Sequence, residues 1–372
     1  MDTRAKGRGP STSDEWSVIE TLLPEGWSQS ARDTGAFRRA RYVKEPREIL
    51  RLLLFHAVSG TGERETLREA KVAGLAQMSQ VGFHKRLRTS GAWLEWIAAG
   101  LCEGLRNSRP EGSRRVRAID STCISRPGSD STDWRLHYTI DLRTLQCDWH
   151  QLTDHTGGES LDRTSVGKGD VLLGDRNFLR PTAVRSVADA GGDVIVRLRW
   201  THSPMVDGDG RPFKALARAR SLRVGEVGEW NVALEVKDHA AVPGRVVATR
   251  LPGPVAAKAE RKAQKRAEKK QRTPDRRSLE AAHFVLLFTT LSRKDLDAER
   301  VLELYRCRWQ IELTFKRLKQ LFKLGQLPNK NSETARSWIA AKLVVALVLE
   351  TLYRNARALS PWGYERARLH AP

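Results

Sequence analysis

The spacing of apolar residues changes near residue 116. From Val43 to about Gly104 the apolar residues recur at helical spacing, as in 47-REILRLLLFHAVSG-60, which ends on a glycine. Beyond Val116 the apolar segments are short, and many are β-branched or alternate with polar residues. They predict strands at 116–122, 136–142, 145–154, 171–177 and 193–199. The second and third strands are close enough for a hairpin, and 181–192 between the last two predicts a helix that Pro181 begins.

This order of elements predicts an α/β protein with a mixed sheet and an antiparallel edge. After residue 200 the sequence pattern changes, and it predicts short strands at 211–222, 229–236 and 245–252. A basic helix, a buried strand at 283–291 and one long helix at 295–323 follow. We therefore expect six parts: a polar lead-in (1–33), a helical domain (34–112), a first core part (113–200), a β-rich insertion with the basic helix (201–282), a second core part (283–345) and a short C-terminal segment (346–372).

Charge narrows the class of partner. Lys and Arg outnumber Asp and Glu by 65 to 44, a formal net charge of +21, and nucleic acid is the commonest partner of so basic a protein. The segment 257-AKAERKAQKRAEKKQRTPDRRS-278 concentrates this charge, which favours contact with a DNA backbone over a solvated helical spur. Residues 64–91 predict two short helices, and the second carries Lys85, Arg86 and Arg88. That pattern suits a helix-turn-helix-like DNA contact or an ordinary helical bundle.

Cysteine usage and hydropathy indicate the compartment. Four scattered cysteines without a CxxC pair argue against a zinc site and a disulfide framework, and they indicate a reducing cytoplasm. No apolar run reaches about 18 residues, so no membrane span is expected. The apolar segment 339–353 carries a lysine and predicts a buried helix.

Two aspartates follow apolar strand segments: Asp120 in 118-AIDST-122 and Asp175 in 172-LLGDRNF-178. A carboxylate at the end of a strand is held on rigid backbone yet reaches solvent, a common position for catalytic and metal-binding groups. A lone aspartate there is more often a turn or cap residue. Two of them on neighbouring strands make catalysis and capping about equally good explanations.

A third carboxylate, Glu312, stands among cations in 301-VLELYRCRWQIELTFKRLKQ-320. On an ideal helix Tyr305, Arg308, Glu312 and Lys319 share one face about 60° wide, with Lys319 about 10 Å from Glu312 and about 21 Å from Tyr305 along the axis. They can therefore line one groove for a polyanion but cannot share one catalytic pocket. Three carboxylates converging in a cationic groove indicate a two-metal site, because hard carboxylate oxygens suit Mg²⁺ and two such ions serve chemistry at phosphorus.

The gaps of two, three and six residues between Tyr305, Arg308, Glu312 and Lys319 resemble the YREK signature of the DDE transposases of bacterial insertion sequences, in the IS-four family. The segments 119-IDST-122 and 174-GDRNF-178 resemble the motifs of the first and second aspartates of that family. The resemblance implies a ribonuclease H-like catalytic core with a mixed five-stranded sheet, interrupted by the β-rich insertion and preceded by the helical domain. It further implies that Asp120, Asp175 and Glu312 hold two Mg²⁺ ions, with Mn²⁺ able to substitute.

By the same resemblance, Tyr305, Arg308 and Lys319 contact transposon-end DNA, and the enzyme works as a dimer that cuts double-stranded DNA and joins the 3′ ends to a target. A ribonuclease H-like nuclease without strand transfer is the nearest alternative. A non-catalytic DNA-binding descendant would have no reason to keep all three acids, and a basic RNA-binding factor would need an RNA module that the sequence lacks.

Overall fold

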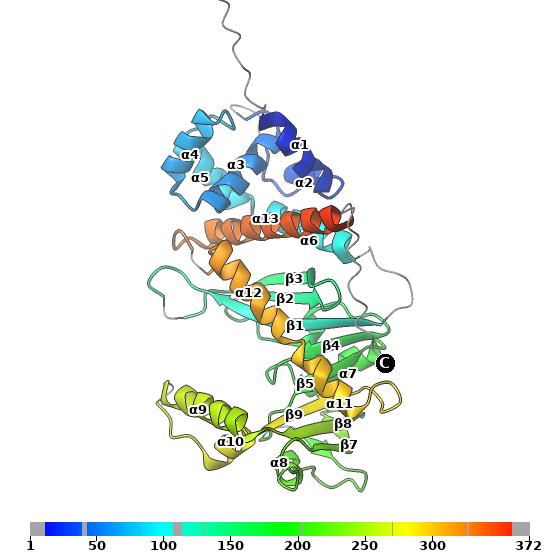
Figure 1. The fold of residues 1–372 in the computed structure, drawn as a ribbon. Helices are drawn as coiled ribbons and strands as arrows, with labels where there is room; N and C mark the ends of the chain where they lie inside the picture. The colour runs from blue at the N-terminus through cyan, green and yellow to red at the C-terminus, as the bar shows by residue number, and fades with distance from the viewer. Residues whose placement is uncertain are drawn as a thin grey trace, which may run out of the picture.

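The structure, a computed structural model, describes residues 12–38, 43–106, 114–129, 131–201, 204–269, 271–325 and 327–358. Its centre is a long sheet, with the N-terminal helices beyond one edge and the helices of residues 253–281 near the other (Figure 1). Helix α12 runs diagonally across the sheet between these two ends (Figure 1).

The N-terminal part is helical, as predicted. Its helices are α1 (Thr12–Leu22), α2 (Trp27–Asp33), α3 (Pro46–Ser59), α4 (Glu63–Val72), α5 (Gln80–Thr89) and α6 (Gly91–Arg106). Pro46 occupies the first turn of α3, and Gly60 ends that helix with φ 67°, in the left-handed region that favours glycine. The prediction of a loose lead-in over 1–33 is wrong for its described part, because α1 and α2 bury Trp16 and Ala31 in the core. Residues 1–11 of that lead-in lie outside the described residues.

The sheet of the described residues has nine strands in the order β3-β2-β1-β4-β5-β9-β8-β7-β6. The strands are β1 (Arg115–Ile124), β2 (Trp134–Asp141), β3 (Gln146–Asp154), β4 (Asp170–Gly174), β5 (Asp193–Arg197), β6 (Met205–Val206), β7 (Val227–Val236), β8 (His239–Arg250) and β9 (Phe284–Thr289). Strands β1, β4 and β5 are parallel, whereas β2 and β3 continue the sheet as an antiparallel hairpin. The first five strands in this order thus form the mixed sheet, flanked by helices, that the sequence predicts for the core.

The β-rich insertion extends the core sheet instead of forming a sheet of its own. Strand β9 pairs antiparallel with β5, and β8 pairs with β9, so the edge of β5 is covered. The short strand predicted at 211–222 is wrong, because that segment contains the helix α8 (Ala215–Ala219). The basic segment forms α9 (Gly253–Lys269), and α10 (Arg276–Ala281) follows it.

The long helix predicted at 295–323 is two helices, α11 (Ala298–Arg306) and α12 (Trp309–Leu321). The two halves pack on different cores. Val301 of α11 packs with β4, β5, β8 and β9, whereas Ile311 and Phe315 of α12 pack with β1, β2 and the N-terminal helices. Backbone bonds that span three residues, such as Arg308 N–H to Tyr305 C=O (3.1 Å), tighten the chain between them.

Two further helices complete the architecture, α7 (Pro181–Asp189) and α13 (Ser332–Ala358), besides a 3₁₀ turn at Leu161–Arg163. Helix α13 runs through residue 345, so the domain boundary expected there does not separate two structural units. It lies against α3, α5 and α6, and its residues share one hydrophobic core with the N-terminal helices and with β1 and β2. Over the described ranges, none of the helices is both long and apolar enough to cross a membrane.

Candidate active site

The register of β1 and β4 brings the two aspartates to one level of the sheet. These parallel strands pair Arg115 with Asp170 and Ala118 with Leu173, a constant offset. Continuing that offset places Asp120 opposite Asp175, just beyond the last paired residues. Because partners in a parallel pair point to the same face, both carboxylates belong to the face that α12 crosses.

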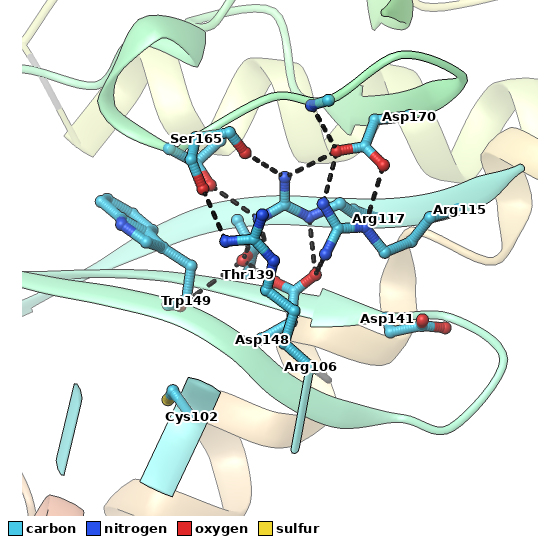
Figure 2. Close-up of polar contacts among 12 residues, drawn as sticks. Cys102, Arg106, Arg115, Arg117, Thr139, Asp141, Asp148, Trp149, Ser165 and Asp170 are labelled. Atoms are coloured by element: carbon cyan, nitrogen blue, oxygen red, sulfur yellow. Dashed lines mark hydrogen bonds and ion pairs between the residues drawn. The ribbon is translucent and has the colours of Figure 1, made fainter. Parts of the chain in front are cut away.

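A buried ionic network fixes that register (Figure 2). Arg115 donates from Nε to Asp170 at 2.9 Å, joining β1 to the start of β4. Arg117 is fully buried and donates to Asp148 of β3 at 2.6 Å and to the carbonyl of Ser165 at 2.6 Å. Slipping a strand by one residue would leave these charges buried without partners, so the network specifies the register that aligns the aspartates.

Asp120 is largely buried, with its side chain 19% exposed. Its Oδ1 accepts a hydrogen bond from the backbone N–H of Ser121 at 2.8 Å, and its Oδ2 lies 3.5 Å from Nη1 of Arg308. Burial raises the pKa of Asp120 from 3.8 to about 7, and the negative charges of Asp175 and Glu159 add to this rise against the opposing effect of Arg308. The carboxylate is therefore held in position and under electrostatic strain.

Asp175 sits in a tight turn directly after β4. Its Oδ1 accepts from the backbone N–H of Asn177 at 2.7 Å, and its carbonyl accepts from Phe178 N–H at 3.1 Å. A Cβ on Gly174 would lie 2.8 Å from the Phe178 side chain, which is fully buried. The segment 174-GDRNF-178 thus has a glycine for close approach, an apolar anchor and an aspartate fixed between them.

Arg308 joins α12 to Asp120. Its guanidinium lies between two carboxylates, bonding Glu312 four residues along the helix and Asp120 on β1. It also lies over the ring of Tyr305, 5.8 Å from the centroid. The break between α11 and α12 places Arg308 here, so the structure brings Tyr305, Arg308, Glu312 and Asp120 together.

Glu312 differs from the aspartates, because its side chain is 60% exposed. Within the described part of the chain, no group of three or more His, Cys, Asp or Glu side chains is placed to hold a metal ion as it stands. Lys319 lies on α12 two turns beyond Glu312 and is exposed. It therefore lies outside the cluster.

The three cations predicted on α5 have different surroundings. Arg86 is half-buried, donates to the carbonyl of Ala36 at 2.8 Å and lies over the ring of Phe37, so it holds the loop after α2. Arg88 is exposed and pairs with Glu333 of α13 at 2.5 Å. Lys85 is exposed. The turn between α4 and α5 is present, but one of the three cations on α5, Arg86, packs against the rest of the protein.

Sequence patterns missed a fourth carboxylate, Glu159. It accepts from Oγ of Ser121 at 2.6 Å and lies 3.5 Å from Arg135. Ser121 is the residue whose N–H orients Asp120, so Glu159 supports the site through it. It stands in a loop without periodicity, and only its place in 156-TGGES-160, beside two glycines, could have drawn attention to it.

The donor set fits a divalent cation. Burial raises the pKa of Asp120, and the negative charges of Asp175 and Glu159 raise it further, so the negative charge of Asp120 is poorly compensated. Hard carboxylate oxygens are the ligands that Mg²⁺ prefers, and a divalent ion among them would neutralise this repulsion.

Fixed carboxylates beside arginines at the end of a sheet are typical of enzymes that transfer phosphoryl groups on a polyanion. Residues 111–349 match the family described as the transposase DDE domain. The chain belongs to the DDE transposases of bacterial insertion sequences, enzymes that cleave DNA and transfer strands. Enzymes of this family generally use a divalent metal ion.

Similar curated proteins carry the same assignment. The InsL protein of insertion sequence element IS186A from Escherichia coli (strain K12), named as a transposase, is 35% identical over 94% of this chain and 96% of its own length. The transposase for insertion sequence element IS421 from Escherichia coli is 34% identical over the same shares. Among solved structures, a piggyBac transposase in a synaptic complex with hairpin DNA aligns over 92% of this chain and 80% of its own, with 10% identity and a TM-score of 0.42. That likeness is too distant to bear on the site.

Proposed function

We propose that Asp120, Asp175 and Glu312 are the catalytic carboxylates of this transposase and that they hold two Mg²⁺ ions, with Mn²⁺ able to substitute. The observation that carries the proposal is the alignment of Asp120 with Asp175 on adjacent parallel strands, under a helix whose Arg308 bridges Asp120 and Glu312. Bound there, the ions would activate a water or hydroxyl and stabilise the leaving oxygen at phosphorus.

The chain's own groups orient these ligands. Backbone N–H groups of Ser121 and Asn177 each fix one oxygen of an aspartate. The second oxygen of Asp120 lies 3.5 Å from Arg308, so a metal ion bound there would share this oxygen with the guanidinium or displace it. Arg308 keeps Glu312 on the side of α12 that faces Asp120, and the Tyr305 ring supports the guanidinium. Fixed carboxylates reduce the reorganisation that the chemical step requires.

DNA contacts extend along α12 and reach the N-terminal helices. Tyr305 and Arg308 stand at the carboxylates, and Lys319 lies further along, so the three would follow the backbone of a transposon end. Lys85 and Arg88 are exposed on α5 and would contact DNA beyond it. The half-buried Arg86 is left out of this surface, because its guanidinium is engaged by Ala36 and Phe37.

The enzyme would act in the cytoplasm as a homodimer that pairs two element ends and joins their 3′ ends to a target. A nuclease that cuts without joining is the second candidate, and the products distinguish the two. Joined molecules require strand transfer, whereas linear fragments alone indicate a nuclease.

The experiment uses the full chain and a plasmid that carries the inverted repeats flanking its coding sequence. We expect cleavage and joined products with Mg²⁺ and none with a chelator. Asp175→Ala and Glu312→Gln should abolish both products while retaining binding to the ends. Glu303→Gln, at an exposed acid of α11, is the matched control and should keep full activity. Cleavage by Asp175→Ala at the rate of the unaltered protein would refute the assignment.

A further inference from the structure

Arginines gather where β4 and β5 end. These parallel strands pair Gly174 with Val196. The residues that follow therefore lie at the same end of the sheet, the carboxyl end of the two strands, which is called this edge below. They are Arg176 after β4 and Arg197 and Arg199 at and after the end of β5. A hydrogen bond from Arg199 to the side-chain oxygen of Asn177, at 2.6 Å, confirms that the two chain segments stay together beyond the paired residues. Asp175 is part of the same edge, so the arginines surround one of the proposed catalytic carboxylates.

A further arginine reaches this edge from the insertion. Arg266 on α9, like Arg197 and Arg199, lies close enough to Arg176 for their positive charges to interact. The negative charge of Asp175 also lies within reach of Arg176. All four arginines are exposed. Like charges held this close repel one another, and an anion bound among them would remove the repulsion.

Helix α9 continues the positive charge away from this edge. On an ideal helix Lys258, Lys262, Lys265, Arg266 and Lys269 fall within about 100° of one another, and each is exposed. The buried Ala256 lies on the other side, and the acids Glu260 and Glu268 lie outside this face. Glu260 is also occupied by His283, 2.7 Å away. The helix therefore turns one cationic stripe to solvent.

We propose that Arg176, Arg197 and Arg199, together with the cationic stripe of α9, form one track that binds consecutive phosphates of the DNA on one side of the cleavage position. This inference rests on the proposed function, because it takes Asp175 as part of the cleavage site. The stripe from Lys258 to Lys269 is about 16 Å long, which matches about five phosphates of one strand. The insertion thus holds the DNA that leaves the active site.

The test measures binding of the full chain to duplexes that carry one element end. One duplex stops at the cleavage position on one side, one stops there on the other side, and one continues through it. The probe variant is Lys262→Gln/Arg266→Gln, with Arg176→Gln as a second probe. Arg218→Gln, which removes an equally exposed charge on α8 of the same insertion, is the control. Arg266→Lys keeps the charge and should behave as the unaltered protein.

We expect the double variant to bind the continuous duplex at least about tenfold more weakly and to reduce the slope of log affinity against log salt by about two, since each lost phosphate contact removes about 0.9. Only one of the two shortened duplexes should show this loss, and the control should show none. An unchanged slope, or an equal loss on all three duplexes, would overturn the track. Cleavage by the unaltered protein is scored separately: its absence refutes the proposed function, whereas cleavage with indifferent variants refutes the track alone.

Discussion

Replacing Asp120 by asparagine should stabilise the folded protein at alkaline pH while it abolishes cleavage. The carboxyl has a pKa of 3.8 in the unfolded chain and about 7 in the fold, chiefly because it is buried. Between these values the folded state holds the proton more tightly than the unfolded chain does. Stability that the neutral carboxyl contributes is therefore fully present below about pH 4 and is lost as the pH rises to about 7.

The magnitude follows from that interval. At about 1.4 kcal/mol per pKa unit, the step from 3.8 to about 7 corresponds to about 4 kcal/mol of lost stability at pH 8. Asparagine keeps the oxygen that accepts from Ser121 but buries an amide N–H₂, so about half of this, roughly 2 kcal/mol, should be recovered. In a chain of 372 residues this corresponds to an increase in Tm of about 2–3 °C.

The assay is a series of thermal melts in a chelating buffer from pH 5 to pH 8.5. The excess Tm of Asp120→Asn should be largest at pH 8 and fall to less than half at pH 5. Asp189→Asn, at an exposed ion pair at the end of α7, should change the Tm little at any pH. Added Mg²⁺ should narrow the gap at pH 8, because the ion stabilises the protein that binds it. A variant no more stable than the unaltered protein at pH 8, or a difference in Tm that does not change with pH, would refute this reasoning.

Three further changes test other parts of the structure. Arg308→Ala should reduce cleavage and flatten the salt dependence of end binding by about one in the log–log slope, and an unchanged slope would make Arg308 purely structural. Arg117→Met should lower the free energy of unfolding, measured in urea, by about 3–5 kcal/mol because Asp148 and Asp170 lose a buried partner. A decrease of less than about 1 kcal/mol would show that the network does not fix the register. Burial raises the pKa of Glu350 to about 7, so Glu350→Gln should raise the Tm at pH 8 but have little effect at pH 4, and melts showing a uniform effect would contradict this.

Much of the fold was predictable, because the strands of the core show their burial in their sequence. Asp120 and Asp175 stood out as polar residues directly after apolar runs, and the hairpin of β2 and β3 followed from its short connection. The register that aligns the two aspartates was not predictable. It depends on Arg115 and Arg117, two cations that look like solvent-facing residues in the sequence but are buried by partners from β3 and β4.

The break between α11 and α12 was missed for a related reason. Helical periodicity continues across residue 307 without a glycine or proline, and only the existence of two separate cores explains why the chain turns. The arginines near Asp175 were equally hidden, since Arg197 and Arg199 continue the alternation of a strand. The core strands were therefore predictable from the sequence and the acids stay a prediction, whereas packing between distant elements decided the geometry.

The shared core of α13 and the N-terminal helices affects the order in which the molecule can be completed. Leu53, Phe83 and Leu94 come from the first third of the chain, yet they pack with Trp338 and Leu347 near its end. During synthesis the apolar side of the early helices therefore remains exposed to solvent until residues 332–358 have left the ribosome. By then both aspartates and Glu312 have already been made. A complete N-terminal surface thus appears only on chains that already carry the whole catalytic core, and a chain cut short by a premature stop would not form it.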